Sequence, residues 1–325
     1  MIEIIRYSEN LKEQWNSFLN VSKNPSFLFD RNFMDYHSDR FKDYSLLAFI
    51  DNNLVAILPA NIDNGKLISH QGLSYGGLIF NNDLRLSEIT EIVKAVLVYL
   101  SSNGIYSWIL KLIPRMYNLR PSDELDWVLF KLAAKIYRRD TALVIDNNAE
   151  HLQYQERRKR SIKKALKLDI TIRSGDSEFD PFWDQILVPN LLSKHGVKPV
   201  HSIEEIKLLA SRFPDNIKQY NIYLHTKIVA GCTIFLNKNV VHAQYISGSS
   251  EGRNSGCLDY LFDHLIKNEF SSYRYFDFGI CNELEGQFIN KGLLDWKEGF
   301  GARTIIHEFY EIMPQNVYLL ENFIM

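Results

Sequence analysis

Two histidines and a lysine fall within the seven-residue segment HGVKPVH, at His195, Lys198 and His201. An imidazole titrates near neutral pH, so these side chains in a Gly/Pro loop suit acid–base catalysis or the binding of an anionic acceptor. A metal site is disfavoured because no nearby cysteine or pair of carboxylates completes a set of ligands. We therefore expect the segment to line a substrate pocket, and the alternative is a loop with a structural role only.

A second candidate is the segment SGSSEGRNSG, between an expected strand over 240–247 and an expected helix near Cys257. Small residues allow backbone N–H groups to turn inward, and the start of a helix adds positive potential. An arginine there can donate two hydrogen bonds to one phosphate. The pattern predicts a pyrophosphate-binding loop, and the alternative is an ordinary strand–helix connection. The predicted contacts are Ser247, Arg253, Asn254 and Gly256.

Polar side chains also follow the last strand of this region, in the segment FDFGICNE over 276–283. Ligands of open α/β sheets gather at the carboxyl ends of strands, so we expect Asp277, Asn282 and Glu283 to reach a binding cleft.

Two further side chains receive a structural interpretation. Cys281 has no base at a fixed spacing, which disfavours a nucleophile and favours a small buried residue. His242 alternates inward with Gln244 on its strand and is interpreted as a core or pocket-floor histidine.

Basic residues are concentrated between Arg157 and Lys167, where seven of eleven residues are Lys or Arg and none is acidic. The chain as a whole has a formal net charge of −2, so its entire surface is not a platform for nucleic acid. The block predicts a local attraction for anions, such as an anionic substrate or an RNA backbone. The alternative is a solvated helix face.

Composition places the chain among ordinary globular proteins. Its 325 residues, 46% apolar and 23% charged, have room for two domains. Three cysteines without CxxC spacing disfavour disulfides and zinc and fit a reducing cytoplasm. The apolar runs are short and the N-terminus has no apolar signal region, so we expect a cytoplasmic protein without a transmembrane segment or metal.

The elements that position these residues occur twice, over 45–113 and 221–300. Each copy reads as a strand, a polar turn, two further strands, a glycine loop, a helix and a closing strand, and the predicted turns are Asp51–Asn53 and Thr226–Lys227. A unit of this size that occurs twice predicts a duplicated domain rather than a solenoid. We expect an α/β fold with mixed sheets, in two similar halves that share a cleft. The predicted domains are 1–149 and 150–303, with a final strand and tail over 304–325 that packs back on the first half.

The periodicity predicts helices over 11–19, 87–100, 150–168, 179–193 and 203–212, and a last strand over 304–311.

This order of elements resembles the GNAT N-acyltransferase superfamily. The segment YFDFGICNELEGQFINKGLLDWKEGFGAR resembles the Fem-type branch, in which two GNAT-like halves share one chain. Two departures stand out: Leu258 replaces the last small residue of the GNAT phosphate motif, and Leu294 and Asp295 stand where GNAT enzymes often have a tyrosine acid.

The resemblance implies N-acyl transfer from acetyl-CoA or another acyl-CoA, held by the 247–257 loop, to an amine such as an amino sugar or a cell-envelope precursor. Lys297 matches a Fem-type lysine that stabilises an oxyanion or leaving group, and Glu283 or His195 is the expected base. The loop Gly72–Gly77 lies where the Fem-type first half meets its acceptor, and that half, which has no arginine phosphate loop, is expected to be degenerate. The expected acceptor contacts are His201, Lys198, Asp277, Asn282 and Tyr75.

Two alternatives stay open. One is aminoacyl transfer from a charged tRNA to a peptidoglycan-type precursor, which the basic block at 157–167 supports. The other is a non-catalytic pair of domains that binds a ligand.

Overall fold

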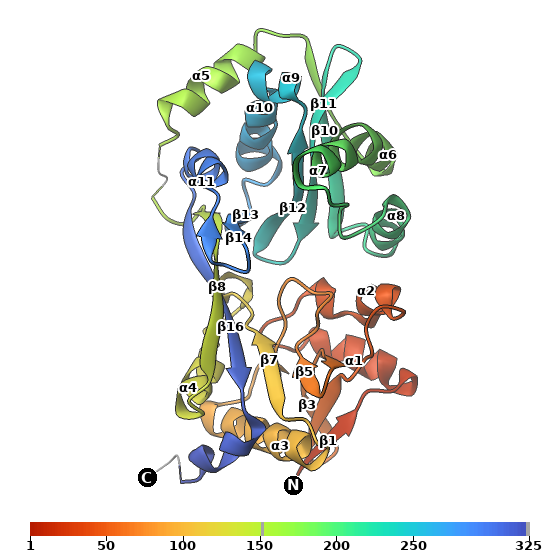
Figure 1. Ribbon diagram of the computed structural model, residues 1–325, viewed down its shortest axis with the longest axis vertical. Coiled ribbons are helices and arrows are strands. Elements are labelled where there is room, and N and C mark those ends of the chain that lie inside the picture. The colour runs from red at the N-terminus through yellow and green to blue at the C-terminus, as the bar shows by residue number, and fades with distance from the viewer. Residues whose placement is uncertain (151–152, 323–325) are drawn as a thin grey trace. The chain divides into compact units, whose positions relative to one another are not determined.

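The computed structural model describes residues 1–150 and 153–322, with the backbone alone at His195. The chain forms two compact units (Figure 1). Unit 1 is Met1–Asp140 with Ile306–Met325, and unit 2 is Thr141–Ile305.

Two long strands, β8 (Lys135–Asp146) and β16 (Arg303–Ile312), each run across a unit boundary. The boundaries therefore fall inside strands, whereas the sequence placed them near 149 and 303.

Unit 1 contains two groups of paired strands, one in the order β1-β2-β3-β6 and one in the order β4-β5-β7-β16. Among the described residues, the strand pairs of these groups are antiparallel, except that β5 pairs with β7 in parallel. The elements are β1 (Ile2–Arg6), α1 (Lys12–Leu19), α2 (Arg31–Met34), β2 (Leu46–Ile50), β3 (Asn53–Leu58), β4 (Asn61–Asp63), β5 (Lys66–Ile68), β6 (Ile79–Phe80), α3 (Leu86–Ser102), β7 (Ser107–Lys111), α4 (Glu124–Lys131) and the 3₁₀ helix Pro314–Leu320.

Helix α3 supplies much of the core of unit 1. Its buried residues Ile89, Val93, Val96 and Leu100 recur at helical spacing and pack in one cluster with the strands. The helix begins at Leu86, one residue before the predicted start, and the Glu88 carboxylate accepts a hydrogen bond from the backbone N–H of Arg85.

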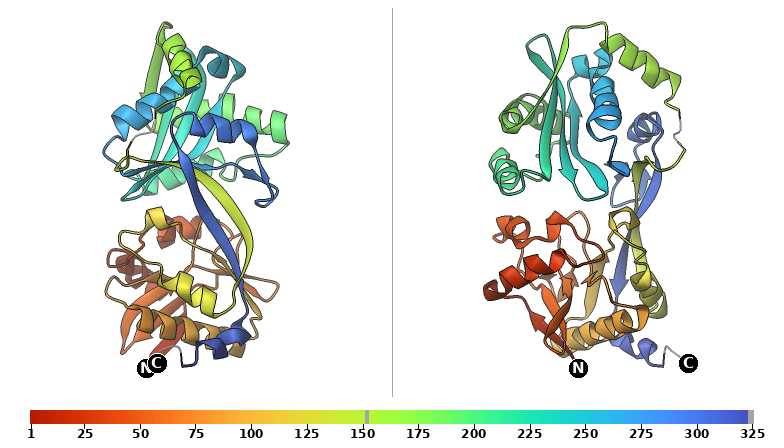
Figure 2. Two further views of the ribbon diagram at one scale, coloured as in Figure 1. Left: turned by 90° about the vertical axis from the view of Figure 1, so that its left-hand side faces the viewer. Right: turned by 180° about the vertical axis from the view of Figure 1, so that it is seen from behind.

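Unit 2 is a mixed sheet in the order β8-β13-β12-β11-β10-β9, in which only β12 and β13 pair in parallel. Figures 1 and 2 show α10 on one face of this sheet and α6, α7 and α8 on the other. The elements are α5 (Glu156–Ala165), β9 (Ile170–Ser174), α6 (Phe179–Phe182), a π-helical segment (Trp183–Leu187), α7 (Val188–His195), α8 (Ile203–Arg212), β10 (Ile217–Leu224), β11 (Lys227–Leu236), β12 (Val240–Gly248), α9 (Ser250–Ser255), α10 (Cys257–His264), a second π-helical segment (Leu265–Glu269), β13 (Tyr275–Ile280), β14 (Asn282–Glu283), β15 (Phe288–Ile289) and α11 (Lys291–Glu298).

An aromatic cluster joins α10, α11 and the sheet in unit 2. Phe262 of α10 stacks on Phe278 of β13, with 5.3 Å between ring centroids. Trp296 of α11 meets Phe262 edge-on at 5.0 Å and Phe300 at 5.3 Å. Offset and edge-on aromatic pairs add stability beyond the area they bury, so this cluster fixes where α11 lies against β13.

The prediction of a mixed α/β fold is confirmed, and several boundaries differ from the predicted ones. Helix α8 matches its predicted limits, and Ser202 and Glu205 form a capping box at its start. Helix α5 begins only at Glu156, because Gln155 is extended and its backbone N–H donates to the carbonyl oxygen of Gly299. The second hairpin turn lies one residue earlier than predicted, with His225 at a φ of 54°.

Gly256, between α9 and α10, offers a test of this packing. Its φ is 85°, and a Cβ there would overlap the carbonyl oxygen of Ser161 in α5. We expect Gly256→Ala to lower the free energy of unfolding by about 2–4 kcal/mol, measured by urea denaturation. Gly196 has a φ of 66° and no heavy atom within 4 Å of its Cβ position. Gly196→Ala is therefore the matched control, and it should cost only about 1 kcal/mol. Equal losses in the two variants would contradict the packing of α5 on this glycine.

Candidate functional site

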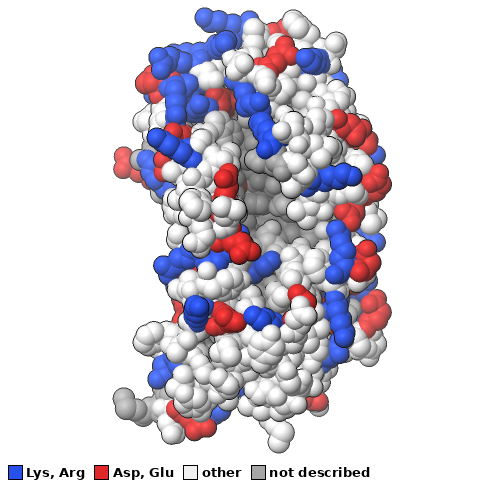
Figure 3. Space-filling view, in the orientation of Figure 1, with Lys and Arg blue, Asp and Glu red and all other residues white. Residues whose placement is uncertain are grey.

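The two parallel strands of unit 2 separate soon after they meet. β12 and β13 pair only from Val240↔Tyr275 to His242↔Asp277. Beyond that point β12 stays paired with β11 as far as Gly248, and β13 stays paired with β8 as far as Ile280. The strands therefore diverge from the level of His242, and Figure 3 shows the surface hollowed over this part of unit 2, beside α11.

A histidine and a carboxylate lie where the strands separate. His242 Nδ1 is 2.7 Å from Asp277 Oδ2, and Asp277 is completely buried. The other carboxylate oxygen accepts a hydrogen bond from the Gly279 N–H at 2.7 Å. A buried carboxylate favours the tautomer that carries its proton on Nδ1, which leaves the Nε2 lone pair available as a base. The His242 side chain is 19% exposed, so solvent or a substrate can reach it.

The backbone on both sides of this pair departs from regular strand geometry. Gly279 has a φ of 73°, and a Cβ there would lie 3.4 Å from His242 Cε1. On β12, the register with β11 shifts between Thr233 and Ile234, which makes Gln244 the extra residue of a bulge. Bulges are common beside active sites because they redirect side chains and interrupt pairing.

Lys297 brings a positive charge to the end of β13. Its ammonium donates hydrogen bonds to the carbonyl oxygens of Gly279 at 2.9 Å and Ile280 at 2.7 Å. The side chain is buried, and burial lowers the pKa of this lysine, while Cys281 and Asp277 oppose the shift. Trp296, its neighbour in α11, is anchored in the aromatic cluster, which sets the position of the ammonium.

Cys281 lies beside this group as a buried residue, 1% exposed, and burial raises the pKa of its thiol. A thiol in that state is a poor nucleophile, in agreement with the structural interpretation from the sequence.

The segment predicted as a phosphate loop is largely helical, since α9 occupies Ser250–Ser255. Arg253 folds back over the end of β12 and donates to the Gly248 carbonyl and, at 3.3 Å, to Ser250 Oγ. Asn190 of α7 donates to Ser247 Oγ at 2.8 Å. The loop prediction was wrong in form because Ser249 caps a helical turn through the Gly252 N–H.

A second cation stands beside Arg253. Burial and the nearby Arg253 guanidinium both lower the pKa of Lys194, on α7. Lys194 is exposed, and two cations in one region of the surface attract an anion. His195, which the sequence predicted, has a side chain outside the described residues. Lys194 beside it was not predicted, because no local motif links α7 to the loop after β12.

The other predicted residues of this loop have structural partners. The carbonyl oxygen of Asn254 accepts a hydrogen bond from Lys164 of α5 at 2.8 Å. Gly256 is covered by Ser161 of the same helix. Leu258, the departure from the GNAT motif, is buried in the core of unit 2.

The predicted acceptor contacts fall into different environments. His201 is 5% exposed, and its Nδ1 lies 2.6 Å from the hydroxyl of Tyr245. Lys198 is exposed in the same loop. Asn282 accepts hydrogen bonds from the backbone N–H and the hydroxyl of Thr141 at 2.6 and 2.8 Å. Glu283 is exposed and accepts from Asn290 at 2.7 Å.

Tyr75, the remaining predicted contact, belongs to unit 1. It is 3% exposed, and its hydroxyl lies 3.0 Å from Ser26 Oγ. This loop is held by Lys111, whose ammonium donates to the carbonyl oxygens of His70, Gln71 and Leu73 at 3.3, 3.3 and 2.9 Å. Burial lowers the pKa of Lys111 to about 8.

The basic block on α5 has two kinds of side chain. Arg158 forms a salt bridge with Asp259 of α10, and Arg157 donates to the Asp295 carbonyl, so both help to attach the helix. A second group is exposed, and Figure 3 shows basic side chains gathered over α5. This group is Arg160, Lys163, Lys164 and Lys167, at the i, i+3, i+4, i+7 spacing of one helix face.

Among the described residues, no cluster of three or more His, Cys, Asp or Glu side chains is arranged to hold a metal ion. None of the described helices combines the length and the apolar character needed to cross a membrane.

A known family model matches a part of the chain that lies within unit 2. Residues 151–298 match the family model for an acetyltransferase (GNAT) domain. No curated protein is similar enough in sequence to be matched to this chain.

Three solved structures share the fold over nearly the whole chain. The crystal structure of FemX is 10% identical, with a TM-score of 0.67, and the match covers 98% of this chain and 99% of FemX. A C-terminal domain assigned to a lysylphosphatidylglycerol synthetase of Agrobacterium fabrum is 12% identical, with a TM-score of 0.61 and coverage of 94% and 92%. A tandem GNAT protein from the clavulanic acid biosynthesis pathway is 8% identical, with a TM-score of 0.50 and coverage of 97% and 99%. At these identities the likeness is one of fold.

The lowered pKa of Lys111 makes stability depend on pH. Below pH 8 the folded and unfolded chains both carry the proton, and the cost of burying the charge is fully present. Between pH 8 and the ordinary lysine pKa of 10.5, the folded chain releases the proton first, so this cost disappears as pH rises. We expect the unfolding free energy of the native chain, relative to that of Lys111→Met, to rise by up to about 3 kcal/mol from pH 7 to 10.5.

Urea denaturation of both chains at each pH measures this difference. Lys135→Met, which removes an exposed lysine of unit 1, is the control and should show no such rise. A flat difference for Lys111→Met would contradict the burial of its ammonium.

Proposed function

Because residues 151–298 match the family model for an acetyltransferase (GNAT) domain and the chain shares its fold with FemX and a tandem GNAT protein, we propose that this protein is an N-acyltransferase that moves an acyl group from acyl-CoA to an amine. The observation that carries the proposal is the His242–Asp277 pair where β12 and β13 separate, with the Lys297 ammonium at the end of β13. Fold alone does not decide an activity, so the argument rests on what these side chains do.

The acyl donor is a substrate that supplies a thioester, and its phosphates need a cationic site. Arg253 and Lys194 are suited to this role, because they are close enough for the arginine to lower the lysine pKa. Ser247 Oγ, already bonded to Asn190, lies at the same end of β12. We assign donor binding to these groups, with Asn254 and Gly256 supporting the loop through α5.

In the transfer, the amine nitrogen attacks the thioester carbonyl carbon, a C–N bond forms and the C–S bond breaks. His242 Nε2 accepts the proton that the amine loses, and Asp277 holds the imidazole in the required orientation. The thiolate that leaves takes up one proton, so charge and protons balance. The Lys297 ammonium keeps the Gly279 and Ile280 carbonyls in place and provides positive potential near the developing oxyanion.

The acceptor is an amine, and the resemblance noted from the sequence places amino sugars and cell-envelope precursors first in a screen. Lys198 and Glu283 are the predicted acceptor contacts that the structure leaves exposed. His201 and Asn282 bond to Tyr245 and Thr141, so we assign them a supporting role near the acceptor.

A second candidate function is aminoacyl transfer from a charged tRNA. The specific observation in its favour is the exposed face of α5, where Arg160, Lys163, Lys164 and Lys167 present a row of charges. Neutralising phosphates with such a row gives binding that weakens steeply with salt.

The donor site is tested by titrating acetyl-CoA calorimetrically into the native chain, Arg253→Ala and Lys194→Ala. We expect saturable micromolar binding that each substitution weakens about 5- to 50-fold, because each removes a charge-assisted hydrogen bond to phosphate. Lys207→Ala, which breaks an exposed pair with Asp180, should leave the affinity unchanged.

The absence of saturable binding would exclude the acyl-CoA proposal. In that case tRNA binding, lost at high salt and in the Lys163→Glu/Lys167→Glu variant, would establish the second candidate.

The base is tested by His242→Gln and Asp277→Asn, assayed with acetyl-CoA and a panel of amines. Loss of a general base predicts a fall in kcat of about 10²- to 10⁴-fold with little change in KM for the donor. The matched control is His225→Gln, because His225 pairs with Asp169 at 3.1 Å on the surface of the same unit. Wild-type kcat in both variants of the His242–Asp277 pair would refute the assignment.

A further inference from the structure

The β14–β15 hairpin, Asn282–Ile289, follows directly after the end of β13 and exposes several apolar side chains (Figure 1). Leu284, Phe288 and Ile289 are 72%, 61% and 49% exposed. Leu293 of α11, a few residues after β15, is 43% exposed. Single exposed apolar residues are ordinary, but apolar residues that gather on one exposed element mark an interaction site.

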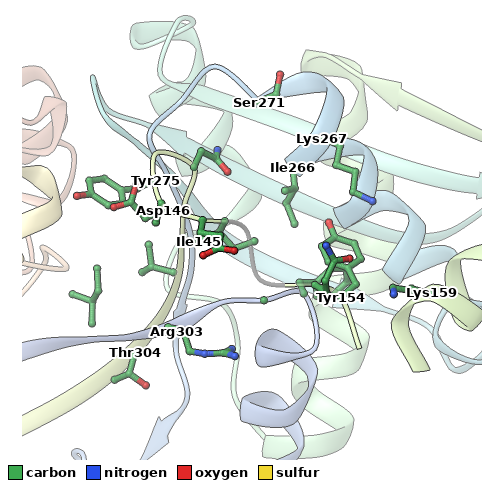
Figure 4. Close-up of a pocket in the computed structure, with 18 residues that line it drawn as sticks. Ile145, Asp146, Tyr154, Lys159, Ile266, Lys267, Ser271, Tyr275, Arg303 and Thr304 are labelled. Atoms are coloured by element: carbon green, nitrogen blue, oxygen red, sulfur yellow. The ribbon is translucent and has the colours of Figure 1, made fainter. Parts of the chain in front are cut away.

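This apolar surface is separate from the cavity of unit 2 that Figure 4 shows. Tyr275, at the start of β13, is one of the residues that line the cavity. The hairpin follows the other end of the same strand, and none of its residues, all of which the structure describes, lines the cavity. The exposed side chains of the hairpin are therefore available to a different ligand.

Hydrogen bonds at its base hold the hairpin against α11. The Asn290 N–H donates to the Cys281 carbonyl at 2.8 Å, which closes the base of the hairpin. The Asn290 side chain accepts from the Leu293 N–H at 3.0 Å and so caps α11. Because α11 also carries Lys297, which donates to the last carbonyls of β13, the hairpin is fixed beside the proposed reaction site.

The tip of the hairpin has a strained backbone. Leu284 and Glu285 have φ values of 47° and 54°, in the left-handed region that favours glycine. The Gln287 N–H donates to the Leu284 carbonyl at 3.2 Å, and Asn282 donates to the Gly286 carbonyl at 3.3 Å. These bonds fix the turn in a conformation that is otherwise rare. Strained residues of this kind cluster at ligand-binding sites.

The hairpin also places a carboxylate beside an aromatic ring. Glu283 lies directly opposite Phe288, and directly opposite residues of an antiparallel pair share one face. The Asn290 amide donates to Glu283 at 2.7 Å, which orients the carboxylate without cancelling its charge. Glu285 at the tip is a second exposed carboxylate, and the exposed Lys291 comes only after the hairpin. The hairpin itself is therefore acidic.

Charge distinguishes the occupants that suit an exposed apolar hairpin. The carboxylates of Glu283 and Glu285 repel anionic membrane lipids and the anionic acyl-CoA donor. An ammonium group that carries an apolar body suits both features of the hairpin. Its cation is attracted by a carboxylate and by the face of an aromatic ring, and its body removes apolar side chains from water.

We propose that the β14–β15 hairpin binds an amine with an apolar body, alkyl or aryl. The ammonium is attracted to Glu283, and the body lies against Phe288 and the tip residue Leu284. This inference names the class of acceptor for the proposed function, and it rests on that function for the role of the amine as acceptor.

The test titrates three probes calorimetrically into the native chain. Octylamine carries an ammonium and an apolar chain, ethanolamine carries an ammonium with a polar body, and octanoate carries a similar apolar chain with the opposite charge. We expect octylamine to bind at least about tenfold more tightly than either of the others. Phe288→Ser and Glu283→Gln should each weaken octylamine binding about fivefold or more, because one removes the apolar contact and the other removes the charge.

Two matched controls remove similar groups from unit 1. Phe130→Ser removes an aromatic ring of α4 that is 79% exposed, and Glu13→Gln removes an exposed carboxylate of α1. Both should leave octylamine binding unchanged. A titration with acetyl-CoA separates the two proposals. Octylamine binding without acetyl-CoA binding supports the hairpin site and counts against the donor site, whereas acetyl-CoA binding without octylamine binding overturns the hairpin site.

Three further results would overturn the hairpin site. They are no octylamine binding up to about 10 mM, equal binding to the native chain and both hairpin variants, and octanoate binding as tight as that of octylamine. Sedimentation of the native chain tests the remaining occupant: a dimer that Phe288→Ser dissociates identifies a second copy of the chain and rejects the amine. Thermal unfolding of each variant confirms that it is folded, and Glu283→Gln keeps the test valid if Phe288→Ser is not.

Discussion

The buried carboxylate of Asp277 is the interaction that holds the proposed site of unit 2 together. One of its oxygens pairs with His242 across the last register position that β12 and β13 share, and the other accepts the Gly279 N–H. A buried charge is stable only when it is fully hydrogen-bonded, so both partners are held at this point. The positive φ of Gly279 then turns its carbonyl, together with that of Ile280, toward Lys297. The position of the His242 imidazole, the separation of the strands and the position of the Lys297 ammonium therefore all depend on this one side chain.

The Lys297 ammonium is held in place by the packing of α11 and not by the Asp277 carboxylate. The burial of Lys297 lowers its pKa and disfavours its charge, and two carbonyl oxygens compensate only if α11 is held firmly. Trp296 and Phe300 provide this support through the aromatic cluster with Phe262 and Phe278. The Trp296 indole also donates to Asp259 at 2.7 Å, the carboxylate that binds Arg158 of α5. The Asp259 carboxylate thus joins helices α5, α10 and α11 at the edge of an apolar core.

The contact of Arg158 with Asp259 explains why helix α5 has two different sides. Its buried side binds α10 and covers Gly256, which closes the start of that helix to a phosphate. The cations proposed to bind phosphate are instead Arg253, which contacts the end of β12, and Lys194 near it. The exposed side of α5 keeps its charges for solvent or for a polyanion. The replacement of the last small residue of the GNAT motif by Leu258 fits this arrangement, because Leu258 packs into the core rather than facing a ligand.

Several features were predictable because they depend on short stretches of sequence. Alternating and helical periodicity predicted the mixed α/β elements, and Ser202 with Glu205 marked the start of α8. The segment GLLDWKEGFG drew attention to Lys297 through its resemblance to the Fem-type pattern, and its role stays a prediction. The glycine- and serine-rich segment located Arg253, although the helical form of α9 was missed.

What the sequence alone determined is therefore local: the type and order of the elements, and the side chains carried by short motifs. The tertiary structure decided which distant residues meet. His242 was interpreted as a structural histidine because Asp277, its partner, lies on another strand, and only the register of β12 with β13 joins them. Lys194 likewise acquires meaning only where α7 packs beside Arg253. Strand register and helix packing depend on burial summed over the whole unit, and no window of sequence contains that sum.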